Sequence, residues 1–313
     1  MKINAIIRII LWSVIALILS AILLGVLNGY RGARLFSLAD FFRNSLVFNS
    51  GIDENYEYPE GSSALPWETV HKIEVDWVSG GVQVQVYDGN EITFEAEGVD
   101  IEEVLCYSLQ DGKLTIRSGD KQQKWNLFFS SEDKNLQLKL PQALLEQLYE
   151  IEIETASGAI RVVDVQAEEI AAESVSGDIE MANVVAQTLE LGSVSGKVVC
   201  INSEAEQLKA ENTSGIVRLQ GNFKKVKAES VSGEIYLEAA VAPQKFDGCS
   251  VSGEIILSLT AMPGFTADVD TVSGSFVSDY PTLSQKSNKV YGDGSCEYDF
   301  ETVSGNIYIK KQG

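Results

Sequence analysis

The residues that first suggest chemistry are serines, each followed directly by a glycine, that recur along the chain. Residues 172–181 read AESVSGDIEM, and residues 228–237 read AESVSGEIYL. A catalytic serine needs a neighbouring base, and His71 is the only histidine, so it could serve at most one of these serines. The nucleophile-elbow pattern G-x-S-x-G is also missed, because GSVSG at 192–196 has Val194 at its centre. We therefore expect a structural role for the serines and assign no catalytic residue.

Acidic residues and cysteines are the other groups that could bind a ligand. The cysteines show no C-x-x-C or paired zinc spacing; they are Cys106, Cys200, Cys249 and Cys296. A row of mostly acidic residues lies four positions before successive Ser-Gly glycines; it consists of Glu154, Glu173, Gly192, Glu211, Glu229, Cys249, Asp270 and Glu301. Stacked carboxylates could collect calcium or a cationic partner, but Gly192 interrupts the row, and Lys209 and Lys227 can screen it. We interpret the row as a solvated acidic face and predict no metal ion and no cofactor.

The spacing of the Ser-Gly pairs indicates what positions them. The glycines of the last eight pairs are separated by 19, 19, 19, 18, 20, 21 and 31 residues; they are Gly158, Gly177, Gly196, Gly215, Gly233, Gly253, Gly274 and Gly305. Positions two and four after the glycine, and two and seven before it, are mostly apolar and are predicted to face a core. Offsets of seven and two before the glycine cannot share one strand face, so the chain must turn a corner within the motif. Coils of about 19 residues that bury their apolar side only by stacking are typical of a β-solenoid.

This fold gives each residue of the motif a structural role. The glycine allows either an unusual backbone conformation or a close approach that a Cβ atom would block. Hydroxyl and amide side chains three positions before it, together with the serine directly before it, can satisfy backbone groups at the bend. The residues three positions before the glycines are Thr155, Ser174, Ser193, Asn212, Ser230, Ser250, Thr271 and Thr302.

Residues 67–150 are predicted to form β-hairpins that lead into the solenoid at 151–313. The segment 82–97 alternates in polarity on both sides of a turn at Asp88-Gly89-Asn90, and the segment 104–118 does the same around Asp111-Gly112. A further strand is expected at 135–141. A short helical turn or a bend is expected directly after it.

The amino-terminal residues indicate a membrane anchor. Nineteen residues from Ile9 to Leu27 carry no charge, and such a helix would span ~28 Å, about the thickness of the hydrocarbon core of a bilayer. A cleaved signal peptide is the alternative, but a cleavage site is not evident. We expect an anchor at 1–30 and a juxtamembrane segment and acidic linker at 31–66. Because long domains translocate largely regardless of charge, the bulk of the chain is expected outside the cytoplasm.

Charge and spacing also narrow the range of partners. The formal net charge is −21, which repels phosphate backbones and excludes nucleic acid as a partner. The longest interval between glycines contains residues 279–297. We interpret this loop as a cap that covers the last coil, with a binding loop as the alternative.

Laid side by side, the motifs TASGAI, SVSGDI, SVSGEI, TVSGSF and TVSGNI, behind a single amino-terminal anchor, resemble those of the bacterial β-strand-repeat putative adhesins. The resemblance covers roughly residues 67–313. It implies a β-solenoid, often tethered to a membrane in a cell-envelope setting. It offers no catalytic residue that could be transferred to this chain.

The fold class expected is therefore all-β, a β-solenoid preceded by hairpins, with one amino-terminal transmembrane helix. The function expected is that of a non-enzymatic, membrane-anchored, extracytoplasmic module for surface interaction or cell-envelope structure, with a protein or glycan partner. One alternative is a self-assembling scaffold, similar to bactofilins, on the cytoplasmic side. A polysaccharide-active β-helix enzyme is a further alternative.

Overall fold

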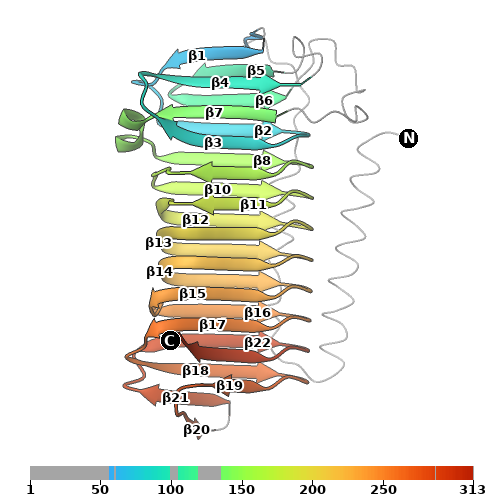
Figure 1. Cartoon of the computed structure of the whole chain (residues 1–313), viewed down its shortest axis with the longest axis vertical. Helices are drawn as coiled ribbons and strands as arrows, with labels where there is room; N and C mark the ends of the chain where they lie inside the picture. Colours follow the sequence, from blue (N-terminus) through green and yellow to red (C-terminus); the bar gives the residue numbers. More distant parts are fainter. Residues whose placement is uncertain (1–55, 60, 99–104, 119–134, 286, 313) are drawn as a thin grey trace, which may run out of the picture.

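The described part of the chain forms a rod of stacked β-strands (Figure 1). In this computed structural model the structure describes residues 56–59, 61–98, 105–118, 135–285 and 287–312. The anchor predicted at 1–30 and most of the linker predicted at 31–66 lie outside the described residues. Within them, no helix is both long enough and apolar enough to cross a bilayer. All 23 strands belong to one hydrogen-bonded sheet, which confirms the all-β class and the stacking of coils.

Each coil crosses the rod twice and so contributes to two layers that enclose a common core. Layer A comprises the strands that precede the Ser-Gly corner: β2 (Lys72–Trp77), β8 (Glu150–Thr155), β10 (Glu169–Ser174), β12 (Val185–Ser193), β16 (Lys245–Ser250), β22 (Cys296–Thr302) and β18 (Gly264–Thr271). Layer B comprises the strands that follow it: β3 (Val82–Tyr87), β9 (Ile160–Val163), β11 (Ile179–Ala182), β15 (Ile235–Val241), β17 (Ile255–Ala261), β23 (Ile307–Lys311) and β19 (Phe276–Ser278). Two long strands pass from layer B into layer A of the next coil: β13 (Val198–Asn212) and β14 (Val217–Ser230).

Parallel pairing in constant register aligns equivalent positions of successive coils. Ile151 pairs with Ile170, and Ile170 pairs with Leu189. The column seven positions before the glycine is buried throughout; it consists of Ile151, Ile170, Leu189, Leu208, Val226, Phe246, Tyr298 and Ala267. The columns two and four positions after the glycine are buried as predicted, except in β19, where Phe276 and Ser278 are half-buried. The hydrophobic core is therefore a continuous filling between the two layers.

One predicted inward column is wrong. The residues two positions before the glycine are mostly half-buried, and Val272 is exposed; they are Ala156, Val175, Val194, Thr213, Val231, Val251, Val272 and Val303. The inward position is one residue earlier, where polar side chains such as Ser174 and Asn212 are buried. The reason is that the backbone alternation of layer A continues one residue further than the apolar pattern suggests.

The corner opposite the Ser-Gly motif uses a different device. Asp164, Asn183 and Asn202 have φ angles of 60°, 55° and 51°, and Gly221 follows in the same role with φ 156°. Aspartate, asparagine and glycine are the residues that adopt positive φ most readily. From residue 150 onward the positive φ angles therefore lie at this corner, apart from those of Gly292 and Gly294 beside β21, whereas among the Ser-Gly glycines only Gly80 has one.

At the amino-terminal end the strands stack out of sequence order. Layer A ends with β6 (Lys113–Ser118) and β5 (Leu105–Gln110), and layer B ends with β7 (Asn135–Pro141), β4 (Glu91–Glu97) and β1 (Ser62–Pro66). The predicted hairpin around Asp111-Gly112 is confirmed as β5–β6. The predicted hairpin at 82–97 is wrong, because β7 lies between β3 and β4 and pairs with both. The expected helical turn is a 3₁₀ helix, η3 (Gln142–Glu146).

At the other end the last coil is inserted between two earlier ones. β22 pairs with β16 on one side and β18 on the other, and β23 lies likewise between β17 and β19. Figure 1 accordingly places the carboxyl terminus beside β17 and not at the tip of the rod. The loop predicted as a cap forms β20 (Leu283–Gln285) and β21 (Asn288–Gly292), and β21 covers the edge of β18 in antiparallel pairing. It therefore caps the coil at 264–278 and not the coil at 296–311.

Candidate functional site

Buried polar residues of the Ser-Gly corner form hydrogen bonds within the corner and between successive coils. In the coil that turns at Gly177, the hydroxyl of Ser174 accepts a hydrogen bond from the Gly177 N–H at 2.7 Å. In the next coil, the Ser193 hydroxyl accepts from the Gly196 N–H at 2.9 Å and donates to the Gly177 carbonyl at 3.0 Å. This arrangement confirms the predicted ladder, since each side chain joins its own corner to the preceding one.

The glycine is required for close approach. A Cβ atom at Gly177 would lie 1.8 Å from the Gly158 carbonyl oxygen, and one at Gly196 would lie 1.9 Å from that of Gly177. Neither distance is possible for non-bonded atoms. Of the two roles predicted for the glycine, close packing of successive corners is therefore the one that applies.

The exposed serines directly before the glycines have no base nearby. The Ser176 hydroxyl donates only to the Ala156 carbonyl, at 3.3 Å. His71 lies beside the β5–β6 turn, where a Cβ atom at Gly112 would meet its ring, and its backbone N–H donates to the Gly112 carbonyl. The structure therefore does not bring the histidine to a serine.

The cysteines are buried and unpaired, all four of them. Burial raises the pKa of the Cys106 and Cys200 thiols to about 11 and also raises that of Cys249. These thiols are protonated at neutral pH, whereas a nucleophile or metal ligand must be a thiolate. The described residues contain no cluster of histidine, cysteine and carboxylate side chains suited to a metal ion.

The acidic row on the outer side of layer A is only partly solvated. Glu211 and Glu229 are 3% and 2% exposed, and they form ion pairs with Lys209 and Lys227 two residues earlier on the same strands. The prediction of a uniformly solvated acidic face is therefore wrong at these two coils, because the carboxylates are paired with lysines and withdrawn from water. Burial is also the largest cause of the raised pKa of Glu229.

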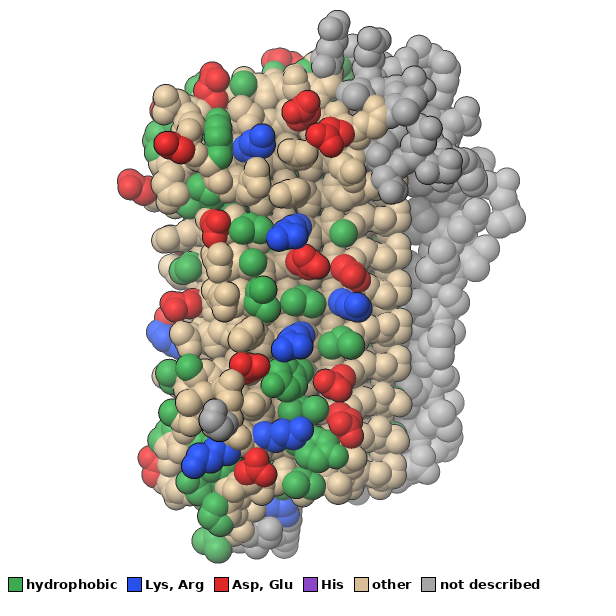
Figure 2. All heavy atoms as spheres, in the orientation of Figure 1, with side chains coloured by type: hydrophobic (Ala, Val, Ile, Leu, Met, Phe, Trp, Pro, Cys, Tyr) green, Lys and Arg blue, Asp and Glu red, His purple; other side chains and the backbone are tan. Residues whose placement is uncertain are grey.

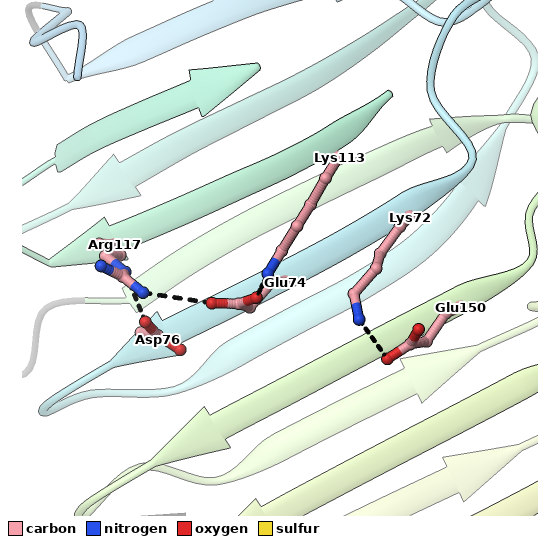
Figure 3. Close-up of polar contacts among 6 residues, drawn as sticks. All are labelled: Lys72, Glu74, Asp76, Lys113, Arg117 and Glu150. Carbon is pink, nitrogen blue, oxygen red and sulfur yellow. Dashed lines mark hydrogen bonds and ion pairs between the residues drawn. The ribbon is translucent and has the colours of Figure 1, made fainter. Parts of the chain in front are cut away.

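Nearer the amino-terminal end, the same face carries a network of ion pairs (Figure 3). Arg117 of β6 contacts Asp76 at 2.5 Å and Glu74 at 3.2 Å, both on β2, and Lys113 also pairs with Glu74. Burial still raises the pKa of Asp76, because desolvation outweighs the attraction of the guanidinium. The network joins β6 to β2 across the point where the chain order is broken.

Next to this network, the carboxylates of three adjacent strands stand in register. Asp76, Glu154 and Glu173 are neighbours in register on β2, β8 and β10. Burial, followed by the charges of Glu173 and Asp76, raises the pKa of Glu154 to about 8. At neutral pH this side chain is mostly protonated, which relieves repulsion within the row.

A second, basic region lies in the middle of layer A. A groove of about 280 Å³ opens on its outer face. It is lined by side chains of β12, β13, β14 and β16 in two adjacent columns: Thr188, Gln207, Lys225 and Lys245 form one column, and Glu190, Lys209, Lys227 and Asp247 form the other. We call these eight residues the lysine groove.

Sequence reasoning missed the lysine groove. Its lysines come from three successive coils and lie eight or six positions before their glycines, in columns that also contain other residue types. Aligning those outward columns in the same way as the inward ones would have shown the lysines side by side. The long face of the rod that Figure 2 shows differs from the lysine groove. Cationic, anionic and apolar side chains are interspersed on it, and no large patch carries charge of a single sign.

Comparison with known proteins finds distant similarity to solved structures. No curated protein matches it. Among solved structures, it is similar to a putative cell adhesion protein from Clostridium sporogenes, with 13% identity, a TM-score of 0.26 and coverage of 82% of this chain and 99% of that chain. It is also similar to a putative adhesin from Bacteroides fragilis, with 14% identity, a TM-score of 0.46 and coverage of 83% and 100%. A putative lipid binding protein from Parabacteroides distasonis shows 16% identity, a TM-score of 0.46 and coverage of 83% and 96%.

The family model that matches is described as Toastrack DUF4097, and it covers residues 70–310, from the loop before β2 to the penultimate residue of β23. This range includes every Ser-Gly corner described above. The chain belongs to the Toastrack DUF4097 family.

Proposed function

We propose that this protein is a non-catalytic binding module, anchored in the membrane by its amino-terminal segment, which presents a rigid β-solenoid to a partner outside the cytoplasm. Such a module serves adhesin-like surface interaction or the structure of the cell envelope. The observation that carries the proposal is that the residues of the repeated motif have a structural role. Their buried side chains, at the Ser-Gly corners, form hydrogen bonds within a corner and to the corner of the preceding coil.

The regular stack supports a binding role over an enzymatic one. Polysaccharide-active β-helices need a cleft walled by loops from several coils, whereas the coils between residues 150 and 261 are joined by short corners. The outer faces are flat strands whose side chains stand in register, which suits recognition of an extended partner. Within the described residues, the lysine groove is the place on such a face where four lysines stand on adjacent strands.

The first experiment is a test of topology and retention. The full chain would be produced in bacterial cells whose wall is then removed, and protease would be added from outside. We expect the protease to cleave the region after residue 66 in intact cells, whereas cytoplasmic proteins should be cleaved only after lysis. A repeat region protected in intact cells would overturn the proposal, and filaments of the purified chain in electron micrographs would replace it with the self-assembling scaffold.

The second experiment measures binding to envelope material. The full chain in detergent would be mixed with isolated cell-envelope fragments and sedimented, with a chain that ends at residue 66 as the matched control. We expect the full chain to sediment with the fragments and the control to stay in solution. Equal behaviour of the two chains would contradict a binding role for the solenoid, and turnover of an added polysaccharide would favour an enzyme.

A further inference from the structure

The lysine groove contains lysines that stand next to one another in register. Lys209 is paired in register with Lys227, and Lys225 with Lys245, on neighbouring strands. Neighbouring strands lie about 4.8 Å apart. Lys225 and Lys227 are also on the same side of β14, two residues apart. Four ammonium groups therefore meet on three adjacent strands.

This arrangement opposes folding in the absence of a ligand. Like charges directly across neighbouring strands destabilise a sheet. Lys209 and Lys227 are relieved by their ion pairs with Glu211 and Glu229, at 3.0 and 2.7 Å. Within the part of the chain that the structure describes, Lys225 and Lys245 are exposed and form no ion pair. In a chain with 45 acidic residues, two adjacent unpaired lysines on one face indicate that an anion completes the site.

The groove is short, because acidic residues limit the basic column at both ends. Glu169 precedes Thr188 in register on one side, and Glu297 follows Lys245 on the other. An anionic partner can therefore contact the lysines over two strand steps, a length of about 10 Å, before it meets negative charge. A long polyanion such as nucleic acid would be repelled on both sides.

The remaining lining residues favour a partner rich in hydroxyl groups. Thr188 and Gln207 can donate and accept hydrogen bonds, while Glu190 and Asp247 accept them. No tryptophan, tyrosine or phenylalanine lines the groove, although aromatic anchors dominate the binding energy of most protein interfaces. A hydrated glycan chain with acid groups matches this surface better than a folded protein.

We infer that the lysine groove binds a short segment of an acidic glycan chain, whose carboxylate or phosphodiester groups lie between Lys225 and Lys245 and beside Lys227. This inference rests on the proposed binding function and specifies its ligand. The exposed ammonium groups supply the charge that selects an anion. The polar side chains at Thr188, Gln207 and Glu190 hold the neighbouring hydroxyl groups.

The test measures binding of the full chain in detergent by calorimetry. The probes are oligogalacturonate for carboxylates, a polymer of hexose units joined by phosphodiesters, neutral dextran, and poly-glutamate as an acidic peptide. We expect the double variant Lys225→Gln/Lys245→Gln to weaken binding of at least one acidic carbohydrate by about tenfold or more. The Lys197→Gln variant, at an exposed lysine at the start of the layer B half of one of these coils, should retain the affinity within about twofold. Dextran should not bind, and binding should weaken as salt is added.

Several outcomes would overturn the inference. They are equal binding by the double variant, absence of binding to both acidic carbohydrates, and preference for poly-glutamate. Circular dichroism and urea unfolding would confirm that the variants fold, and the double variant should be at least as stable as the parent, because repulsion between the lysines is removed. If the double variant still sediments with envelope fragments, the inference fails and the binding function stands. If no form of the chain sediments, the binding function fails independently of the glycan measurement.

Discussion

The middle of the rod and its carboxyl-terminal end are built from the same motif but assembled differently. Between residues 150 and 261 each coil lies on the one before it in the sequence. After residue 261 the chain skips one position, forms the coil at 264–278, and returns to fill the gap with the coil at 296–311. The comparison teaches that a repeating sequence specifies which residues lie in register, whereas the order of the coils is decided by the residues that differ between them.

Those differences are concentrated in the core. In the three coils that precede the insertion, the position five before the glycine is small, namely Ala210, Ala228 and Gly248, whereas the last coil places Phe300 there, opposite Gly248. The ring of Phe246 lies 5.5 Å from that of Phe300 and 6.3 Å from that of Tyr298. The aromatic rings of the inserted coil thus pack against Phe246 and fill the core space beside the small residue Gly248.

The largest effect is expected from removing a coil at each place. Deletion of residues 188–206 removes 19 residues (206 − 188 + 1) and joins Gln187 to Gln207 in the same register, so the shortened rod should fold. Deletion of 296–313 should release residues beyond 262, because Tyr298 and Phe300 are lost and the edges of β16 and β18 are left unpaired. Limited proteolysis and urea unfolding would compare the two chains. Equal resistance would mean that the coil at 264–278 closes directly onto β16.

A smaller but still severe effect is expected at the corner glycines. Gly177→Ala places a Cβ atom against the Gly158 carbonyl, with coils on both sides that cannot move apart, and should cost roughly 3 kcal/mol. Gly274→Ala meets the Gly305 carbonyl in the same way, but its coil lies at the end of the rod and can shift. Urea unfolding should therefore show the larger loss for Gly177→Ala. A larger loss at Gly274 would contradict the idea that the end yields more easily.

A smaller difference in the free energy of unfolding is expected when buried hydroxyl groups are removed from the two regions. Ser174→Ala removes the acceptor of the Gly177 N–H and should cost about 1 to 3 kcal/mol. Ser250, at the border of the inserted coil, is also buried, but its hydroxyl has no hydrogen-bond partner among the described residues, so Ser250→Ala should be nearly neutral. The exposed Ser176→Ala serves as a control and should stay within about 0.5 kcal/mol. Equal costs at Ser174 and Ser250 would show that the ladder continues through the insertion.

The smallest effect is expected from pH, at the amino-terminal side of the regular region. The pKa of Glu154 is raised to about 8 from an ordinary value of 4.5, so the folded state binds a proton that the unfolded state releases. Its contribution to stability is complete below pH 4.5 and is lost as pH rises to about 8. Glu154→Gln should therefore flatten the fall in stability between pH 5 and pH 8.5, measured by urea unfolding. Glu146→Gln, at an exposed site after β7, is the control, and an unchanged slope in Glu154→Gln would contradict the assignment.

Period and spacing were enough to predict the stacked coils, the buried columns such as Ile160 to Ile179, and the structural role of the corner. They misplaced the inward residue at the corner, because Val175 looks like a core residue whereas Ser174 is the buried one. Hydrogen bonds to the corner backbone, which a hydropathy pattern does not contain, make burial of that serine favourable.

Coil order and the lysine groove could not be predicted from the same pattern. Since all coils share one register, the pattern does not say which coil pairs with which. The long interval that contains residues 279–297 marks the last coil as irregular, but it does not reveal that β22 lies between β16 and β18. The lysine groove depends on side chains contributed by four separate strands. Such a site becomes visible only when the outward columns are aligned by coil.

The inserted coil also has a consequence for the order of synthesis. Residues 296–311 come after the other strands in the order of the described residues, yet they occupy an interior place in the sheet. This end of the rod therefore cannot close until residues 296–311 have been made, so a chain terminated before them keeps open strand edges that proteases and chaperones recognise. Insertion of this coil thus acts as a check that all of the preceding coils have been followed by their interior neighbour.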